Sequence, residues 1–377
     1  MKNIPMVDLK SQYNNIKTEI DSAIQDVLDK TAYINGPNVK SFQNNLKEYL
    51  NVKEVIPCAN GTDALQIAMM ALGLKPGDEV ITANFTFVAT VEVIALLGLK
   101  PILVDVYPDT FTIDVNAIER AITPKTKAIV PVHLFGQAAD MEAIMKLADQ
   151  YNLYIIEDTA QAMGADYKFS DGRIEKVGTI GHVGTTSFFP SKNLGCYGDG
   201  GAIFTNGEDL SKKLRSIIDH GMNERYYHDN VGVNSRLDTL QAAILDVKLP
   251  HLDTYNSNRI KAATYYDNAF AAYSEIQTPI RFKKSNHIFH QYTLVLNEKI
   301  DRQALQNHLT EKGISSAVYY PVPLHMQVAY QDSRYKEGDF PVTERLCKTV
   351  MSLPIHTEMT SKDLKYITES VIEFIKK

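Results

Sequence analysis

A lysine and an aspartate each follow an apolar, strand-like segment and could together hold a carbonyl cofactor. The run 185–189 leads into Pro190-Ser-Lys192 and then into a glycine-rich turn, while the apolar run 155–157 ends at Asp158. Pyridoxal phosphate (PLP) requires this pair, because an amine must bond its aldehyde carbon and a carboxylate must keep its pyridine nitrogen protonated. The sequence therefore predicts a PLP enzyme in which Lys192 and Asp158 are catalytic.

Each of these two residues also has an ordinary explanation. Most lysines are solvated on the surface, and an aspartate commonly closes a strand. Against a solvated lysine stand the neighbouring Phe188, Phe189 and Tyr197, which would desolvate the Lys192 amine and lower its pKa.

A phosphate site is predicted at Asn60-Gly-Thr-Asp63, which opens a helical segment. The first turn of a helix presents unpaired N–H groups and the positive end of its dipole. Gly61 lets the backbone approach an anion, and the Thr62 hydroxyl and the Asp63 N–H can donate to phosphate oxygens. A plain helix N-cap is the alternative, since Thr and Asp favour that position. Ser187 could add another donor.

Two further residues could contact the cofactor ring. Gln161 is either the first residue of a helix or a donor to the phenolic oxygen of the cofactor, and the sequence leaves both open. Phe87 could stack on the pyridine ring, although packing in the core is the usual role of a phenylalanine.

The composition is that of an ordinary globular protein with room for two domains. The chain has 377 residues and a net charge of −6, which argues against binding to nucleic acid or to an anionic membrane. Its three cysteines, Cys58, Cys196 and Cys347, form no metal-binding pattern and are expected to be reduced thiols. The first residues lack the apolar stretch of a signal peptide. We therefore expect a soluble, cytoplasmic protein without a metal.

Helical and strand patterns alternate from about residue 60 to 205, which predicts an α/β fold with a mostly parallel central sheet flanked by helices. The expected strands are 79–83, 101–106, 127–132, 153–157, 185–189 and 202–205. The expected helices are 62–72, 91–97, 114–122, 140–151, 210–219, 235–248 and 259–273. The segment 167–184 is expected to form a hairpin or a loop.

The C-terminal part shows a different pattern. Strands at 290–296 and 315–319, with helices at 301–312 and 362–375, predict a smaller α+β unit. We therefore expect a large PLP-binding domain over residues 1–250 and a small C-terminal domain over 251–377.

Five motifs resemble those of the DegT/DnrJ/EryC1/StrS group of sugar aminotransferases, and the resemblance covers nearly the whole chain. The motifs are Asn60-Gly-Thr-Asp-Ala-Leu65, Glu157-Asp-Thr-Ala-Gln161, Ser187-Phe-Phe-Pro-Ser-Lys192, Gly198-Asp-Gly-Gly201 and Gly232-Val-Asn-Ser-Arg-Leu-Asp238. The resemblance implies a fold-type I PLP enzyme that installs amino groups on nucleotide-linked keto sugars, with glutamate as amino donor. It also implies a homodimer with shared active sites.

The same resemblance implies a role for each matching residue. Lys192 would form the Schiff base with PLP, Asp158 would hold the pyridinium, Gln161 would contact the ring oxygen and Phe87 would stack on the ring. Side chains that hold the phosphate would be Thr62, Asp63, Ser187 and, from the neighbouring subunit, Asn234. Some members of the group carry histidine in place of the lysine and act as dehydratases, so Lys192 favours transamination.

The sequences of residues 193–201 and 231–245 most resemble those of enzymes that aminate a UDP-linked 2-acetamido-3-oxo-glucuronate during the synthesis of bacterial O-antigen. Arg236 suits the uronate carboxylate, since guanidinium binds carboxylate with two hydrogen bonds, although an interface ion pair with Asp238 is equally plausible. Tyr319, Tyr320 and His325 would line the same pocket.

Three alternatives stay open. They are a 3- or 4-keto-6-deoxy sugar on dTDP, a PLP-binding regulator without turnover, and another PLP reaction on an amino acid, such as decarboxylation or desulfurisation, for which Cys196 on the glycine-rich turn is the nearest thiol in the sequence.

Overall fold

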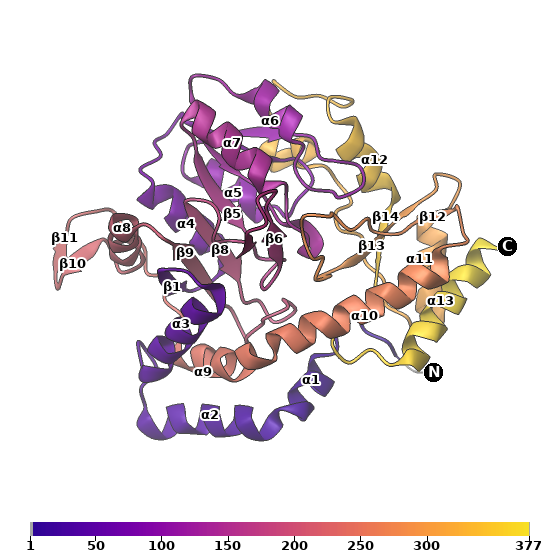
Figure 1. Ribbon diagram of the computed structural model, residues 1–377, viewed down its shortest axis with the longest axis horizontal. Helices are drawn as coiled ribbons and strands as arrows, with labels where there is room; N and C mark the ends of the chain where they lie inside the picture. Colours follow the sequence, from indigo (N-terminus) through magenta and orange to yellow (C-terminus); the bar gives the residue numbers. More distant parts are fainter. Residues whose placement is uncertain (1–2, 377) are drawn as a thin grey trace.

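The computed structural model describes residues 3–376 and confirms the predicted α/β fold. Its centre is a seven-stranded sheet with the strand order β1-β9-β8-β5-β4-β2-β3 (Figure 1). The strands are β1 (Glu54–Cys58), β2 (Glu79–Ala83), β3 (Lys100–Val104), β4 (Thr126–Val130), β5 (Tyr154–Asp158), β8 (Val183–Ser187) and β9 (Gly201–Thr205). Every neighbouring pair from β8 to β3 is parallel, and β9 is antiparallel to both of its neighbours.

Helices cover both faces of this sheet because its central strands are apolar on both sides. Along β2, Val80 and Ile81 are both buried but belong to different core clusters. One cluster contains residues of α6 (Val115–Ala121) and α7 (Met141–Tyr151). The other contains residues of α4 (Gly61–Ala71), α5 (Ala89–Leu96) and α8 (Glu208–Ile218). The continuous apolar runs thus reflect a sheet that is buried on both faces.

A further layer of helices packs beside β1 and β9. It is formed by α1 (Leu9–Asn15), α2 (Lys17–Lys30), α3 (Pro37–Leu50) and α9 (Thr239–Lys248). The long helix α10 (Leu252–Phe270) follows and runs towards the C-terminal part of the chain (Figure 1). Its first residue packs in the core cluster of α3 and α9, and its last residue packs in the C-terminal core.

The C-terminal unit is the α+β unit that the sequence indicates. Its antiparallel sheet has the strand order β12-β13-β14. The strands are β12 (Ile276–Gln277), β13 (Tyr292–Leu296) and β14 (Val350–Leu353), and the helices are α11 (Arg302–Glu311), α12 (Pro341–Thr349) and α13 (Ser361–Ile375). Short 3₁₀ turns occur at Leu134–Gly136, Leu249–His251, Leu324–Met326 and Val328–Tyr330. The domain boundary at 250–251 stays a prediction.

Several element boundaries differ from the sequence-based expectation. The predicted strand 315–319 is wrong, because only Ala317 pairs with another strand residue, Ser352, as an isolated bridge. Helix α9 begins at Thr239 instead of 235. The segment 167–184 does contain a hairpin, formed by β6 (Asp166–Lys168) and β7 (Ile174–Lys176). A second, unpredicted hairpin, β10 (Met222–Glu224) with β11 (Tyr227–His228), projects beyond α8 (Figure 1).

Within residues 3–376, no helix is both long enough and apolar enough to cross a membrane.

Candidate active site

One cavity of about 670 Å³ brings together most of the predicted site residues. It opens where β2, β4, β5 and β8 end, which is the usual place for a ligand in a parallel sheet. The predicted residues that line it are Gly61, Thr62, Asp63, Phe87, Asp158, Gln161, Ser187, Lys192, Tyr319 and Tyr320. Segments far apart in the sequence therefore meet around one ligand-sized space.

The N-terminus of α4 forms one end of this cavity. The Asn60 side chain caps the helix and accepts a hydrogen bond of 2.8 Å from the Asp63 N–H. This corrects the expectation that the Asp63 N–H donates to phosphate, since the cap already uses that donor. The N–H groups of Gly61 and Thr62 have no partner within the helix. A Cβ atom on Gly61 would lie 2.7 Å from the Ser187 Cβ, so only glycine permits this close approach. The end of the cavity therefore fits a phosphate group.

Asp158 is 93 % buried, with 7 % of its surface exposed, and lies at the end of β5. Its Oδ2 accepts a hydrogen bond of 3.0 Å from the Thr90 hydroxyl, and its Oδ1 accepts one of 3.1 Å from the Ala160 N–H. These two donors fix the plane of the carboxylate towards the cavity. Thr90, which lies near the start of α5, could not be identified as a partner of Asp158 from the sequence.

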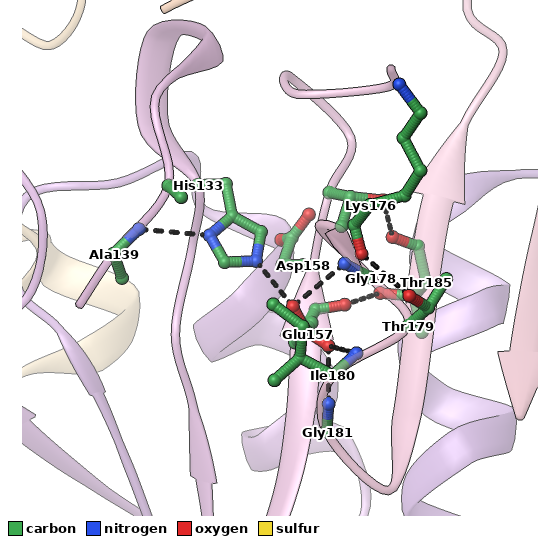
Figure 2. A network of polar contacts seen from close by, with 12 residues as sticks. His133, Ala139, Glu157, Asp158, Lys176, Gly178, Thr179, Ile180, Gly181 and Thr185 are labelled. Atoms are coloured by element: carbon green, nitrogen blue, oxygen red, sulfur yellow. Dashed lines mark hydrogen bonds and ion pairs between the residues drawn. The ribbon is translucent and has the colours of Figure 1, made fainter. Parts of the chain in front are cut away.

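The neighbouring Glu157 points to the other side of β5 and is completely buried (Figure 2). Its carboxylate accepts hydrogen bonds of 2.6 to 2.8 Å from three backbone N–H groups, those of Gly178, Ile180 and Gly181. The His133 Nε2 lies 3.0 Å from the same carboxylate, and its Nδ1 accepts from the Ala139 N–H. The Nε2 atom therefore carries the proton and donates to Glu157. This network ties the turn before β8 to the strand that carries Asp158.

Replacing Glu157 with glutamine should destabilise the protein strongly. The amide NH₂ group would face backbone donors, and each unmatched buried group costs about 1–3 kcal/mol. Urea unfolding should show a clear fall in the free energy of unfolding. Glu175→Gln is a suitable control, because Glu175 pairs with Arg173 on the surface and should change stability by less than about 0.5 kcal/mol. Equal stability of the two variants would contradict this role of Glu157.

Lys192 is partly buried and lies in the wall of the cavity. Burial lowers the pKa of this amine from 10.5 to about 8, while the Asp158 charge acts in the opposite direction. Of the three aromatic residues expected to desolvate it, only Phe189 lines the cavity. Phe188 packs in the core against Phe42, and Tyr197 packs against Tyr13. The predicted lowering of the Lys192 pKa is therefore present, but Phe188 and Tyr197 do not cause it.

The rate at which cofactor-free protein takes up PLP should depend on pH through Lys192. Only the neutral amine attacks an aldehyde, and a lowered pKa makes that form dominant above pH of about 8 instead of about 10.4. The uptake rate, followed by absorbance, should therefore rise with pH and level off above a midpoint near 8. A rate that keeps rising towards pH 10, as for a free lysine amine, would contradict the shift.

Gln161, Phe87 and Tyr320 surround the space in front of Lys192. Gln161 lies in a turn, so the structure does not place it at a helix start. Its Oε1 accepts from the Phe135 N–H, and its Nε2 donates to the Tyr320 hydroxyl at 3.1 Å. Phe87 is 53 % exposed and lines the cavity, which excludes the core-packing alternative. Its ring is free to stack on a planar ligand.

His325 does not line the cavity, which corrects the sequence-based expectation. Its ring is buried against Phe340, and its Nδ1 accepts a hydrogen bond of 2.7 Å from the Asn84 side chain. The Asn84 Oδ1 in turn accepts from the His325 N–H. These bonds hold the loop after β2, which carries Phe87, against the C-terminal unit.

Asn234 and Arg236 also lie outside this cavity. Asn234 is exposed and pairs with Asp219 through a backbone bridge. The Arg236 guanidinium is 3.8 Å from the Asp219 carboxylate, and no ion pair with Asp238 forms within the described chain. Neither residue therefore lines the cavity of its own subunit.

The cysteines give no support to a thiol-based reaction. All three are buried and free, and none lines the cavity. Burial raises the pKa of Cys196 to about 11 and that of Cys347 to about 12, so both are thiols at neutral pH. Among residues 3–376, no group of His, Cys, Asp and Glu side chains could hold a metal ion.

The cavity also contains residues that the sequence analysis did not single out. They include Thr86, Asp199, His290 and Gln291, of which the Thr86 hydroxyl and the His290 Nδ1 are buried without a hydrogen-bond partner in the described chain. Unpaired buried polar atoms are uncommon, so a water, an ion or a ligand is needed to complete the hydrogen bonding of these two atoms.

Comparison with known proteins agrees with this geometry. The model of the DegT/DnrJ/EryC1/StrS aminotransferase family matches residues 14–372. A pleiotropic regulatory protein of Geobacillus stearothermophilus is 46 % identical, with 99 % of this chain and 98 % of the relative covered. The UDP-2-acetamido-2-deoxy-3-oxo-D-glucuronate aminotransferase of Pseudomonas aeruginosa is also 46 % identical, over 97 % and 98 % of the two chains.

Other relatives are named for different substrates. The dTDP-3-amino-3,4,6-trideoxy-alpha-D-glucose transaminase of Streptomyces venezuelae is 38 % identical, over 98 % and 96 % of the chains. The solved structure of S. venezuelae DesV in complex with a ketimine intermediate superposes with a TM-score of 0.95 and 36 % identity, over 100 % of both chains. The chain thus belongs to the DegT/DnrJ/EryC1/StrS aminotransferase family and is a PLP-dependent aminotransferase.

Proposed function

We propose that this aminotransferase moves an amino group from glutamate to the keto group of UDP-2-acetamido-2-deoxy-3-oxo-glucuronate, in the assembly of a bacterial polysaccharide. The observation that carries the proposal is that Lys192, Asp158 and the N-terminus of α4 face one cavity. The relative with this activity, at 46 % identity, supports the choice of sugar.

The residues of the cavity have distinct tasks in this reaction. PLP, when bound, supplies the conjugated ring that takes up negative charge from the reacting carbon. Asp158 holds the proton on the ring nitrogen, and Thr90 orients its carboxylate. Lys192 removes a proton from the α-carbon of the amino donor and delivers it to the C4′ carbon of the cofactor. Its lowered pKa suits it to act as base and as acid near neutral pH. Phe87 covers the ring, while Thr62, Ser187 and the Gly61 N–H hold the phosphate.

A two-fold dimer with shared sites explains the position of Arg236 and Asn234. Arg236 is partly exposed, and its only ion-pair partner in the described chain is the weakly placed Asp219. We infer that Arg236 reaches the uronate carboxylate in the cavity of the neighbouring subunit and that Asn234 reaches the phosphate there. An isologous dimer supplies both residues to both sites.

Mixing a Lys192→Ala subunit with an Arg236→Ala subunit should therefore restore activity. In the mixed dimer, one site has its own Lys192 and the Arg236 of its neighbour, so half of the sites of each mixed dimer should work. Differently tagged subunits allow the mixed dimer to be isolated and assayed beside the two parents. Mixed dimers as inactive as their parents would mean that both residues act within one subunit.

Assays with paired substrates separate this function from its alternatives. With glutamate as donor, the UDP-linked 3-oxo-glucuronate should be aminated faster than a 3- or 4-keto-6-deoxy sugar on dTDP. A preference for the dTDP sugar would favour the second substrate class, which the S. venezuelae relative represents. Bound PLP without any turnover would favour a regulator, as the name of the G. stearothermophilus relative suggests for that protein.

A further inference from the structure

His290 is a buried side chain in the cavity wall, and it has no role in the reaction proposed above. Only 6 % of its surface is exposed, and it lines the cavity together with Lys192 and Gln291. Its Nδ1 atom has no hydrogen-bond partner among residues 3–376. A buried ring nitrogen without a partner is uncommon and needs an explanation, and the cavity beside His290 has room for a ligand that could contact the imidazole.

The backbone around His290 is held firmly in an unusual conformation. The buried Arg259 donates hydrogen bonds of 3.3 Å to the carbonyl oxygens of both Phe289 and His290. The Asn193 side chain, next to Lys192, donates to the Ile288 carbonyl. Phe289 has a φ of +53°, which is rare for a bulky residue. Such strain persists only where the surroundings over-determine it, and it concentrates at functional sites.

The charges around His290 favour an anion. Arg259 is 2 % exposed, and within the described chain its guanidinium bonds backbone carbonyl oxygens and forms no ion pair with a carboxylate. Burial and the charges of Lys192 and Arg259 hold the pKa of His290 well below 6.5, so its imidazole is neutral. A neutral imidazole still carries one N–H donor.

We propose that His290 donates a hydrogen bond to a carboxylate of the amino donor, in the positive field of Arg259. The proposal rests on the proposed function, because it assumes that the donor is an amino acid. It assigns the donor carboxylate to the part of the cavity wall formed by His290 and Gln291, separate from the phosphate site at the N-terminus of α4. Hydrogen bonds to a charged acceptor are stronger than neutral ones, so one such bond contributes strongly to donor binding.

Binding of maleate, a dicarboxylate that cannot react, tests this subsite without relying on turnover. Calorimetry on the PLP-loaded protein should give at least a tenfold higher Kd for His290→Phe than for the unchanged protein. His290→Gln should stay within threefold, because an amide N–H can replace the imidazole N–H. The neutral diamide of maleate should not bind.

His287→Gln is the matched control. His287 is equally buried and stacks on Phe289 at 3.8 Å, but it does not line the cavity. Its replacement should leave the Kd for maleate unchanged. Equal Kd values for His290→Phe and the unchanged protein would overturn the subsite, and so would a loss as large in His287→Gln.

The half-reaction that aminates the keto sugar can be tested separately from the binding of the amino donor. Amination of the keto sugar by protein preloaded with pyridoxamine phosphate needs no donor carboxylate, so His290→Phe should retain at least one third of that rate. A loss in this half-reaction as large as the loss in maleate affinity would overturn a donor-specific role. No maleate binding by the unchanged protein would overturn the subsite, whatever the sugar assay shows.

Discussion

Replacing Lys192 with alanine should abolish transamination while the fold stays intact. Lys192 supplies the amine that bonds PLP and the base that moves the proton, so both functions disappear with the side chain. General acid–base catalysis alone contributes roughly 10²–10⁴ in rate. The phosphate and ring contacts remain, so the variant should still bind PLP or the product without a covalent bond. Steady-state assays of sugar amination and circular dichroism measure the two effects.

Lys212→Ala provides the control for this variant. Lys212 lies on the exposed face of α8 in ion pairs with Glu208 and Asp209, and its loss should leave the rate unchanged. Sugar amination by Lys192→Ala at the rate of the unchanged protein would contradict the assignment of Lys192.

Replacing Asp158 with asparagine should lower the rate at least 10²-fold. The amide has no negative charge to hold the proton on the ring nitrogen, so the ring takes up less charge from the reacting carbon. A hundredfold loss corresponds to about 2.7 kcal/mol in the barrier. The amide oxygen can still accept from the Ala160 N–H, and the amide NH₂ group can donate to the Thr90 hydroxyl oxygen, so the side chain should keep its place.

The measurement is kcat with saturating PLP, after absorbance has shown that the variant binds the cofactor. A change below threefold with PLP bound would mean that Asp158 does not face the ring nitrogen.

The sequence predicts the residues that stand at strand ends but not the contacts made across the chain. Lys192 and Asp158 could be found because uninterrupted apolar runs mark buried parallel strands, and such strands end at one edge of the sheet. Asn60 could also have been found, since asparagine is among the best N-cap residues. Thr90 and His290 could not, because each depends on a partner far away in the sequence.

The errors have similar causes. Residues 315–319 have the composition of a strand, but pairing with β14 is limited to Ala317, and composition does not reveal a missing partner. His325 follows two tyrosines that line the cavity, yet the chain turns there and Asn84 draws the ring into the interior. Local pattern therefore places elements, while tertiary hydrogen bonds decide where individual side chains point.

Transfer of ¹⁵N from labelled glutamate to the UDP-linked 3-oxo sugar tests the central claim most directly. The PLP-loaded protein would be incubated with both compounds, and the mass of the sugar nucleotide would be measured. We expect an amino sugar that carries the ¹⁵N label, and we expect none when Lys192 is replaced with alanine. An unlabelled, unchanged keto sugar, with PLP bound and glutamate present, would contradict it.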